Sequence, residues 1–261
     1  MKRPSLAPPL AVVFALVACG GSLFDDDADV SSGADTLEAV SQTQALLSMA
    51  SDVSSGAVGA EMAATVAAQN SGALFQPAGC VQSQAMGATV TYTFTGCTGA
   101  YGLVNVSGTL RATFSNVTPT SRTIAITGEL TANRVTLRPD ATAQVTFMGS
   151  TRQATVTVRG SGSTPRSSGF TNSGTYMSSW DGTCFGLSGR VTSTSGGASV
   201  TADVVSYRRC RAGCPEAGGR VTITSGRGAS ITLQYGGGAT ATLTGTRGRS
   251  ASVTLYCGGA S

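Results

Sequence analysis

The stretch VNVSGTLRATF, residues 104–114, alternates apolar and polar side chains along its length. Val106, Leu110 and Phe114 belong to one phase of this alternation, and Arg111 belongs to the other. Side chains of a β-strand point alternately to its two faces. The period of two therefore predicts a strand with one buried apolar face and one polar face in contact with water.

The same alternation recurs through the rest of the chain, at Val145 with Phe147, Val156 with Val158, Ile231 with Leu233, and Val253 with Leu255. Glycines between such stretches, at positions 96, 128, 149, 160, 196–197 and 236–238, are interpreted as turns. About a dozen strands that follow one another without an intervening helical pattern predict an antiparallel meander.

An internal repeat supports this interpretation. The segment GRVTSTSGGASVT, residues 189–201, aligns with GRVTITSGRGASIT, residues 219–232, after the insertion of one residue. Each copy has the pattern of a strand, a Ser-Gly turn and a second strand, which is a hairpin. Hairpins that cannot bury a face alone must stack side by side.

A helical pattern precedes the strands. Asp35 followed by Glu38 fits a capping box, and apolar residues at helical spacing then predict helices at 35–52 and 58–69. The predicted fold is mainly β. It is a large curved antiparallel meander, open or partly closed into a barrel, with this short two-helix segment packed on it.

The first residues have the pattern of a secretory signal. Lys2 and Arg3 precede an apolar run, residues 6–18, which is shorter than the ~20 residues that a membrane span needs. The run ends in Leu16-Val17-Ala18-Cys19, which resembles the lipobox of bacterial lipoproteins. The resemblance implies that Cys19 is acylated on sulfur, becomes the mature N-terminus and anchors the protein to a membrane of the bacterial envelope, with the outer membrane favoured.

The chain accordingly divides into four predicted segments. They are a signal peptide at 1–18, a lipid-anchored flexible acidic tether at 19–33, a helical segment at 34–72 and a disulfide-bonded antiparallel β domain at 73–261. The tether is predicted from GGSLFDDDADVSSG, residues 20–33, which is small, acidic and without periodicity.

Six cysteines follow Cys19, namely Cys80, Cys97, Cys184, Cys210, Cys214 and Cys257. An even number in an exported chain predicts three disulfides. Residues equidistant from a turn face each other across a hairpin. This symmetry suggests Cys80 with Cys97 and Cys184 with Cys210, and leaves Cys214 with Cys257. The alternative, a zinc site built on Cys210-x-x-x-Cys214, lacks a second close cysteine pair.

The missing residue types narrow the chemistry. The chain has no histidine, and its only lysine, Lys2, lies in the signal segment. Triads, Ser-Lys dyads, Schiff bases and imidazole metal sites are therefore excluded from the mature chain. We expect no catalytic residue, cofactor or metal. A carboxylate-dependent hydrolase stays open as an alternative, provided that two of the five acids of the β domain face one cleft.

Charge is divided along the chain. Residues 19–79 carry eight acidic and no basic side chains, whereas residues 80–261 carry fifteen arginines and five acids. Arg208, Arg209 and Arg211 surround Cys210 and form the candidate anion-binding site, because guanidinium groups bind phosphate and carboxylate oxygens. No nucleic-acid-binding motif occurs, so nucleic acid is not a predicted partner.

The predicted function is that of a lipid-anchored envelope protein that acts as a non-enzymatic binding or surface-interaction module. Its predicted partners are the membrane, through Cys19, and anionic envelope components or an amphiphile. A second possibility is carriage of a lipid or amphiphile in the concave face of the sheet, in a pocket lined by residues such as Val106, Leu110 and Phe114.

Overall fold

A computed structural model describes residues 57–70, 75–99, 105–132, 135–164, 167–181, 183–195, 197–210 and 214–254. These residues form one helix and one antiparallel sheet of fourteen strands. The signal segment, the tether and the helix expected at 35–52 lie outside them.

The elements follow one another along the chain with short connections. They are α3 (Ala60–Asn70), β1 (Phe75–Gln76), β2 (Val81–Met86), β3 (Thr89–Gly99), β4 (Val106–Ser115), β5 (Ser121–Ala132), β6 (Val135–Met148), β7 (Thr151–Thr164), β8 (Ser167–Trp180), β9 (Cys184–Ser195), β10 (Ala198–Cys210), β11 (Arg220–Ser225), β12 (Ser230–Tyr235), β13 (Thr240–Gly245) and β14 (Ser250–Thr254).

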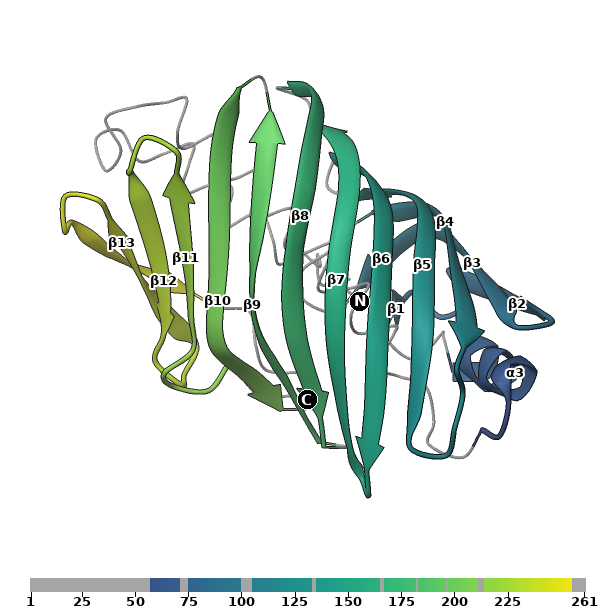
Figure 1. Ribbon diagram of the computed structural model, residues 1–261. Coiled ribbons are helices and arrows are strands. Elements are labelled where there is room, and N and C mark those ends of the chain that lie inside the picture. The colour runs from purple at the N-terminus through teal and green to yellow at the C-terminus, as the bar shows by residue number, and fades with distance from the viewer. Residues whose placement is uncertain are drawn as a thin grey trace, which may run out of the picture.

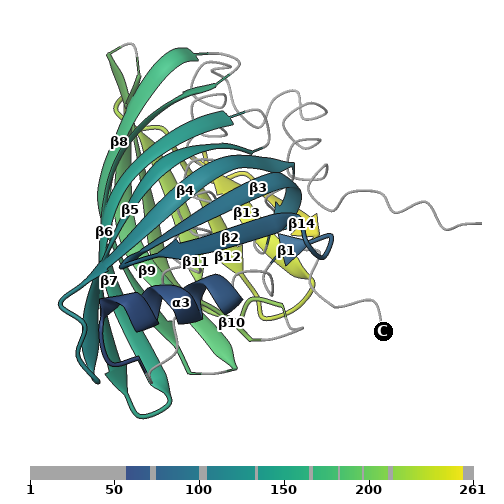
Figure 2. The ribbon, with the colours of Figure 1, turned by 90° about the vertical axis from the view of Figure 1, so that its right-hand side faces the viewer.

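The sheet is a meander, as the sequence predicts. From β3 to β14 each strand pairs with the next one along the chain, and β1 and β2 both pair with β3 (Figure 1). The sheet bends so strongly that β2 and β14, at its two ends, lie on the same side of the central strands (Figure 2). Within the described strands β14 pairs only with β13, so the sheet is open rather than closed.

One face of the sheet is buried and the other is exposed. In β6 every second side chain from Val135 to Phe147 is buried, and the side chains between them are mostly exposed. We call the face with buried side chains the inner face and the opposite one the outer face. The inner face is the concave side, because only there can side chains of separate strands converge into one hydrophobic cluster.

The helix α3 covers one end of the inner face. Its buried side chains Ala63, Ala64 and Ala67 share a cluster with the sheet, and the helix contacts β2, β3 and β4. Ser83 Oγ on β2 donates a hydrogen bond of 2.6 Å to the carbonyl of Ala68. The small alanines let the helix approach the sheet closely. The bounds of α3 confirm the helix expected at 58–69 to within two residues.

Two of the predicted disulfides are present. Cys80 is bonded to Cys97 of β3, and Cys184 at the start of β9 is bonded to its register partner Cys210 at the end of β10. Cys214 is also disulfide-bonded, whereas Cys257 lies outside the described residues. Hairpin symmetry thus identified both described pairs correctly.

Three glycines that were expected in turns lie inside strands instead. Gly96 belongs to β3, Gly128 to β5 and Gly160 to β7, while Gly149 does connect β6 to β7. A Cβ at Gly128 would overlap the carbonyl oxygen of Thr109, and a Cβ at Gly160 would meet the side-chain oxygen of Asn172. These glycines therefore permit close packing within the sheet, and β6, β7 and β8 extend to 14 residues each.

Candidate functional site

The first candidate is the arginine cluster around Cys210. Arg208 donates from Nη1 to Glu216 Oε1 at 2.6 Å and from Nη2 to Asp181 Oδ2 at 3.0 Å. The hydrogen bond to Glu216 and then that to Asp181 raise the pKa of Arg208. The guanidinium is therefore held between two carboxylates, which offset the positive charge that an anionic partner would need.

The other two arginines of this cluster do not join Arg208. A bulge between Val204 and Tyr207 shifts the phase of β10, so Arg209 is on the inner face and Arg208 on the outer face. Burial raises the pKa of Tyr235 to about 12, and the charge of Arg209 opposes this shift. Arg211 lies outside the described residues, so the anion-binding site stays a prediction.

Asp181 begins the turn between β8 and β9. Its Oδ1 accepts the backbone N–H groups of Cys184 at 2.6 Å and of Thr183 at 2.9 Å. These two bonds, the first one above all, and then Arg208 lower the pKa of Asp181. A carboxyl held as its anion is suited to fixing a turn rather than to donating a proton as a general acid.

The remaining acids of the β domain lie elsewhere on the outer face. Glu129 pairs with Arg138 at 2.6 Å, and Asp203 pairs with Arg190. Asp140 is exposed on β6. Among the described residues, Asp181 and Glu216 are the acids that share a partner.

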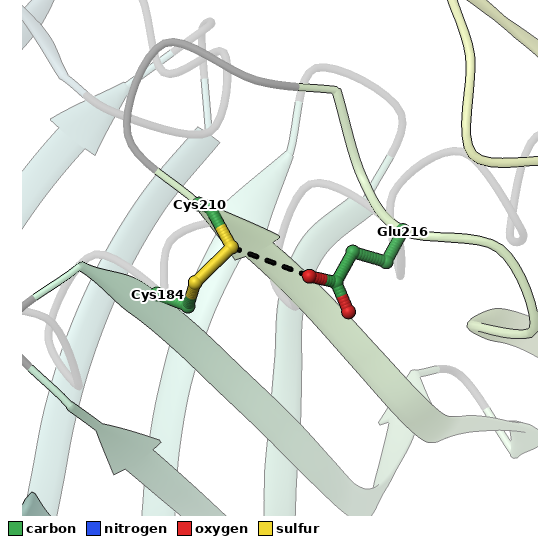
Figure 3. Close-up of side chains that lie close together, drawn as sticks. All are labelled: Cys184, Cys210 and Glu216. Atoms are coloured by element: carbon green, nitrogen blue, oxygen red, sulfur yellow. Dashed lines mark hydrogen bonds between the residues drawn. A yellow bond between two sulfur atoms is a disulfide. The ribbon is translucent and has the colours of Figure 1, made fainter.

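Glu216 also lies beside the second disulfide (Figure 3). Its Oε1 is 3.3 Å from Cys210 Sγ, and the three groups Cys184, Cys210 and Glu216 lie within 4.8 Å of one another. A disulfide sulfur carries no proton to donate, so the distance marks a packing contact. Metal ligation by cysteine requires a thiolate, which neither sulfur offers while the disulfide is intact. The cluster joins β9, β10 and the following loop.

The second candidate lies on the inner face of β8. Asn172, Tyr176 and Ser178 point inward from alternate positions and are 3%, 0% and 4% exposed. Ser193 of β9 is the register partner of Asn172. We call these four residues the β8 polar row. In the described part of the chain, both amide atoms of Asn172 and the hydroxyl oxygens of the other three residues are buried and make no hydrogen bond.

Glycines on the neighbouring strands shape this row. A Cβ at Gly189 would collide with the ring of Tyr176, and a Cβ at Gly160 would collide with the amide of Asn172. The ring of Tyr176 therefore lies over the backbone of Gly189, and the amide of Asn172 lies over the backbone of Gly160. These two glycines are a sequence signal for the row, whereas the alternation of apolar and polar residues did not reveal it.

The residues directly opposite Tyr176 and Ser178 are apolar or glycine, and Arg152 of β7 is the register partner of Trp180, one position further along this face of β8. Val156 and Ala154 of β7 and Leu187 of β9 are register partners of Tyr176 and Ser178, and all three are buried. Burial raises the pKa of Tyr176, so its phenol stays neutral and keeps its proton. A buried hydrogen-bonding group without a partner costs about 1–3 kcal/mol. Such groups in native proteins are nearly always satisfied by protein, water or ligand.

A buried arginine is a further polar group on the inner face. Arg122 of β5 is 2% exposed and stacks on the ring of Phe147, with its guanidinium carbon 4.4 Å from the ring centroid. Desolvation and then the nearby charge of Arg152 lower the pKa of Arg122. The sequence pattern did not predict this inward position.

Fold and site together define an open antiparallel sheet whose mostly apolar inner face carries the neutral β8 polar row and, among the described residues, the arginines Arg122 and Arg209. Comparisons with protein-family models, curated protein sequences and solved structures give no match. The described part of the chain contains no helix that is long and apolar enough to cross a membrane.

Proposed function

We propose that this protein is a lipid-anchored, non-enzymatic binding module of the bacterial cell envelope that holds an amphiphile against the inner face of its sheet. The observation that carries the binding role is the β8 polar row, because its buried polar atoms lack hydrogen-bond partners. Anchoring rests on the lipobox resemblance at Leu16–Cys19. An envelope location agrees with the disulfides, which persist in oxidising compartments.

Burial does not distinguish β8 from β4 as a place for the amphiphile. Val106, Leu110 and Phe114, which the sequence suggested as pocket lining, are buried in the same hydrophobic cluster as Tyr176 and its neighbours on β7 and β9. The β8 polar row differs in its unused donors and acceptors. We therefore place the polar part of the amphiphile near β8.

A non-enzymatic role is supported by the state of the acids. Glu129, Asp203 and Glu216 each face an arginine, and the pKa of Asp181 is lowered. A carboxylate-dependent hydrolase needs one carboxyl that keeps its proton near neutral pH. None of these four carboxyl groups lies in an environment that favours its protonated form.

Intact-mass measurement tests the proposal. Protein purified from bacterial membranes in native form should carry a covalent lipid adduct and a non-covalent ligand that is released on unfolding. The Cys19→Ala variant should lose the adduct and appear in the soluble fraction. A membrane-purified wild type without an adduct would refute the anchor, and one that neither carries nor takes up any amphiphile would refute the binding role.

A further inference from the structure

We infer that residues 35–52 of this chain, the helix expected before α3, dock across one end of the inner face and cover a row of arginines and aromatic side chains there. This row extends over β5–β10, and its members are Arg122, Phe147, Arg152, Trp180, Phe185 and Arg209. We call it the inner arginine row. The inference concerns what covers this end of the sheet and does not depend on amphiphile binding.

Cross-strand register places the members of the inner arginine row side by side. Arg152 of β7 is the register partner of Phe147 on β6 and of Trp180 on β8. Phe185 of β9 is in turn the partner of Trp180 and of Arg209 on β10. Directly opposed residues of an antiparallel pair share a face. Since Phe147 and Phe185 are buried, all five side chains lie on the inner face.

Positive charge gathers at this end of the inner face. Arg122 is 2% exposed and stacks on Phe147, while Arg152 and Arg209 are half-buried. Buried guanidinium groups are paired with opposite charges in folded proteins. Among the described residues, the acids of the β domain lie on the outer face or at the turn of Asp181. The carboxylates that face the row therefore come from residues outside this set or from another molecule.

The helix α3 does not account for the burial of the row. It packs mainly on β2, β3 and β4, whereas the row lies on β5–β10. An apolar sheet face requires a second layer. Both α3 and the C-terminal ends of β6, β8 and β10, which carry the row, lie toward the lower edge of the sheet in Figure 1. The residues that precede α3 are therefore tethered beside this end of the inner face.

Residues 35–52 match the row in charge, polarity and length. Their charged side chains are all acidic, namely Asp35, Glu38 and Asp52. Leucine and valine at positions 37, 40 and 47 recur at helical spacing and can pack on the aromatic rings. At ~1.5 Å per residue, a helix over 35–52 is about 27 Å long. The spacings of ~4.8 Å between successive strands from β5 to β10 amount to about 24 Å.

The connection to α3 sets the direction of the docked segment. Since α3 lies at the β2–β4 end, Asp52 should lie near Arg122, and Asp35 should lie near Arg209. A helix is about 10–12 Å wide, whereas β8 has 14 residues and at ~3.3 Å per residue is about 46 Å long. The segment therefore covers one end of the inner face and does not compete with an amphiphile nearer to Asn172.

Hydrogen exchange of the amphiphile-free, full-length mature protein tests the docking. Amides of residues 35–52 should exchange slowly in the wild type. They should exchange at least tenfold faster in Arg152→Gln with Arg209→Gln, because two charge-assisted hydrogen bonds are lost. Arg111→Gln with Arg159→Gln removes the same charge from the outer face and should leave this exchange unchanged. Exchange in β6–β8 shows whether both variants fold.

A photo-cross-linker locates the docked segment. Leu47→p-benzoylphenylalanine should yield cross-links to peptides of β5–β10 within the same chain. Met49→p-benzoylphenylalanine is the control, because residues two apart on a helix do not share a face. Its cross-links to the same peptides should be at least tenfold fewer.

The contrary outcomes name the other possible covers. Cross-links between two chains would overturn the inference and show that a second copy covers the row. Slow exchange of residues 35–52 only after an amphiphile is added would also overturn it, because the ligand would then order the segment. Fast exchange in every sample, or equal exchange in the wild type and the inner variant, would refute the docking. Loss of amphiphile binding with the docking intact would refute the proposed function alone.

Discussion

At the residue scale, Tyr176 shows how the inner face differs from an ordinary core. Its ring is fully buried and covers the backbone of Gly189, which accounts for tight packing. Its hydroxyl makes no hydrogen bond, and the packing does not require it. Phenylalanine would fill the same space without that polar atom, so the hydroxyl is the part of the residue that ligand binding explains.

Tyr176→Phe should therefore stabilise the delipidated protein. Removal of a buried hydroxyl without a partner relieves its desolvation cost, and we expect the free energy of unfolding to rise by about 1 kcal/mol. Urea unfolding of the two delipidated proteins measures the difference. A stability loss in the delipidated variant would indicate a partner within the protein.

Asp181 gives a prediction on pH dependence. Its folded pKa is lowered, so the carboxylate stabilises the fold above the unfolded pKa of about 4, and this stabilisation is lost as the pH falls through the folded pKa. Asp181→Asn should unfold at lower urea than the wild type at pH 7, and the two midpoints should converge at the acid end. Asp140→Asn removes the same charge from β6 and serves as control. A constant difference across pH would contradict this reasoning.

At the element scale, strands with strong contrast between their faces could be predicted and strands without it could not. β6 alternates apolar and polar residues through its whole length, and its faces match the sequence. β8, SSGFTNSGTYMSSW, is mostly serine, threonine and glycine, and only the aromatic residues Phe170, Tyr176 and Trp180 mark one phase, so the alternation did not indicate that Asn172 and Ser178 point inward. For that reason the sequence did not predict the β8 polar row.

β-Bulges are a second reason why the sequence did not predict which face some side chains occupy. One residue added to a strand shifts every later side chain to the other face. Arg208 and Arg209 are adjacent and would point to opposite faces of any strand. The bulge in β10 decides that Arg209 is on the inner face and Arg208 on the outer face, whereas an unbroken alternation from Val204 would reverse them. By contrast, the disulfides were predictable because hairpin pairing depends on the distance of each cysteine from a turn, and β9 and β10 pair in register at Cys184 and Cys210.

The helix α3 should tolerate change on one side only. Ala64 is fully buried against the sheet, so Ala64→Leu introduces three carbon atoms where there is no room. We expect a loss of about 1–3 kcal/mol in the free energy of unfolding, as for other overpacked cores. Met62 is 51% exposed, and Met62→Leu should change stability by less than ~0.5 kcal/mol. Similar thermal unfolding of the two variants would show that α3 is not packed as described.

At the scale of the whole molecule, the meander has consequences for how it unfolds. From β4 onward each strand pairs only with the strands before and after it in the chain, so each strand is stabilised by its immediate neighbours, as in a repeat protein. Strands β6 to β8 have 14 residues each, whereas β11 to β14 have five or six. The short strands have few ladder bonds, and the side chains of β12 are only half-buried. Opening should therefore begin among β11–β14, the segment that the predicted Cys214–Cys257 bond would enclose.

The Cys184–Cys210 bond joins β9 to β10 next to these short strands, and we expect it to stop the opening there. Its removal by Cys184→Ala with Cys210→Ala should lower the free energy of unfolding by about 3 kcal/mol, for a loop of this length. Hydrogen exchange should show fast exchange in β11–β14 of the wild type and its extension into β9 and β10 in the variant. Cys80→Ala with Cys97→Ala, at the other end of the sheet, should leave exchange in β9 and β10 unchanged. Equal effects of the two variants on β9 and β10 would mean that the sheet unfolds as a single unit, and that the bond sets overall stability rather than a boundary within the fold.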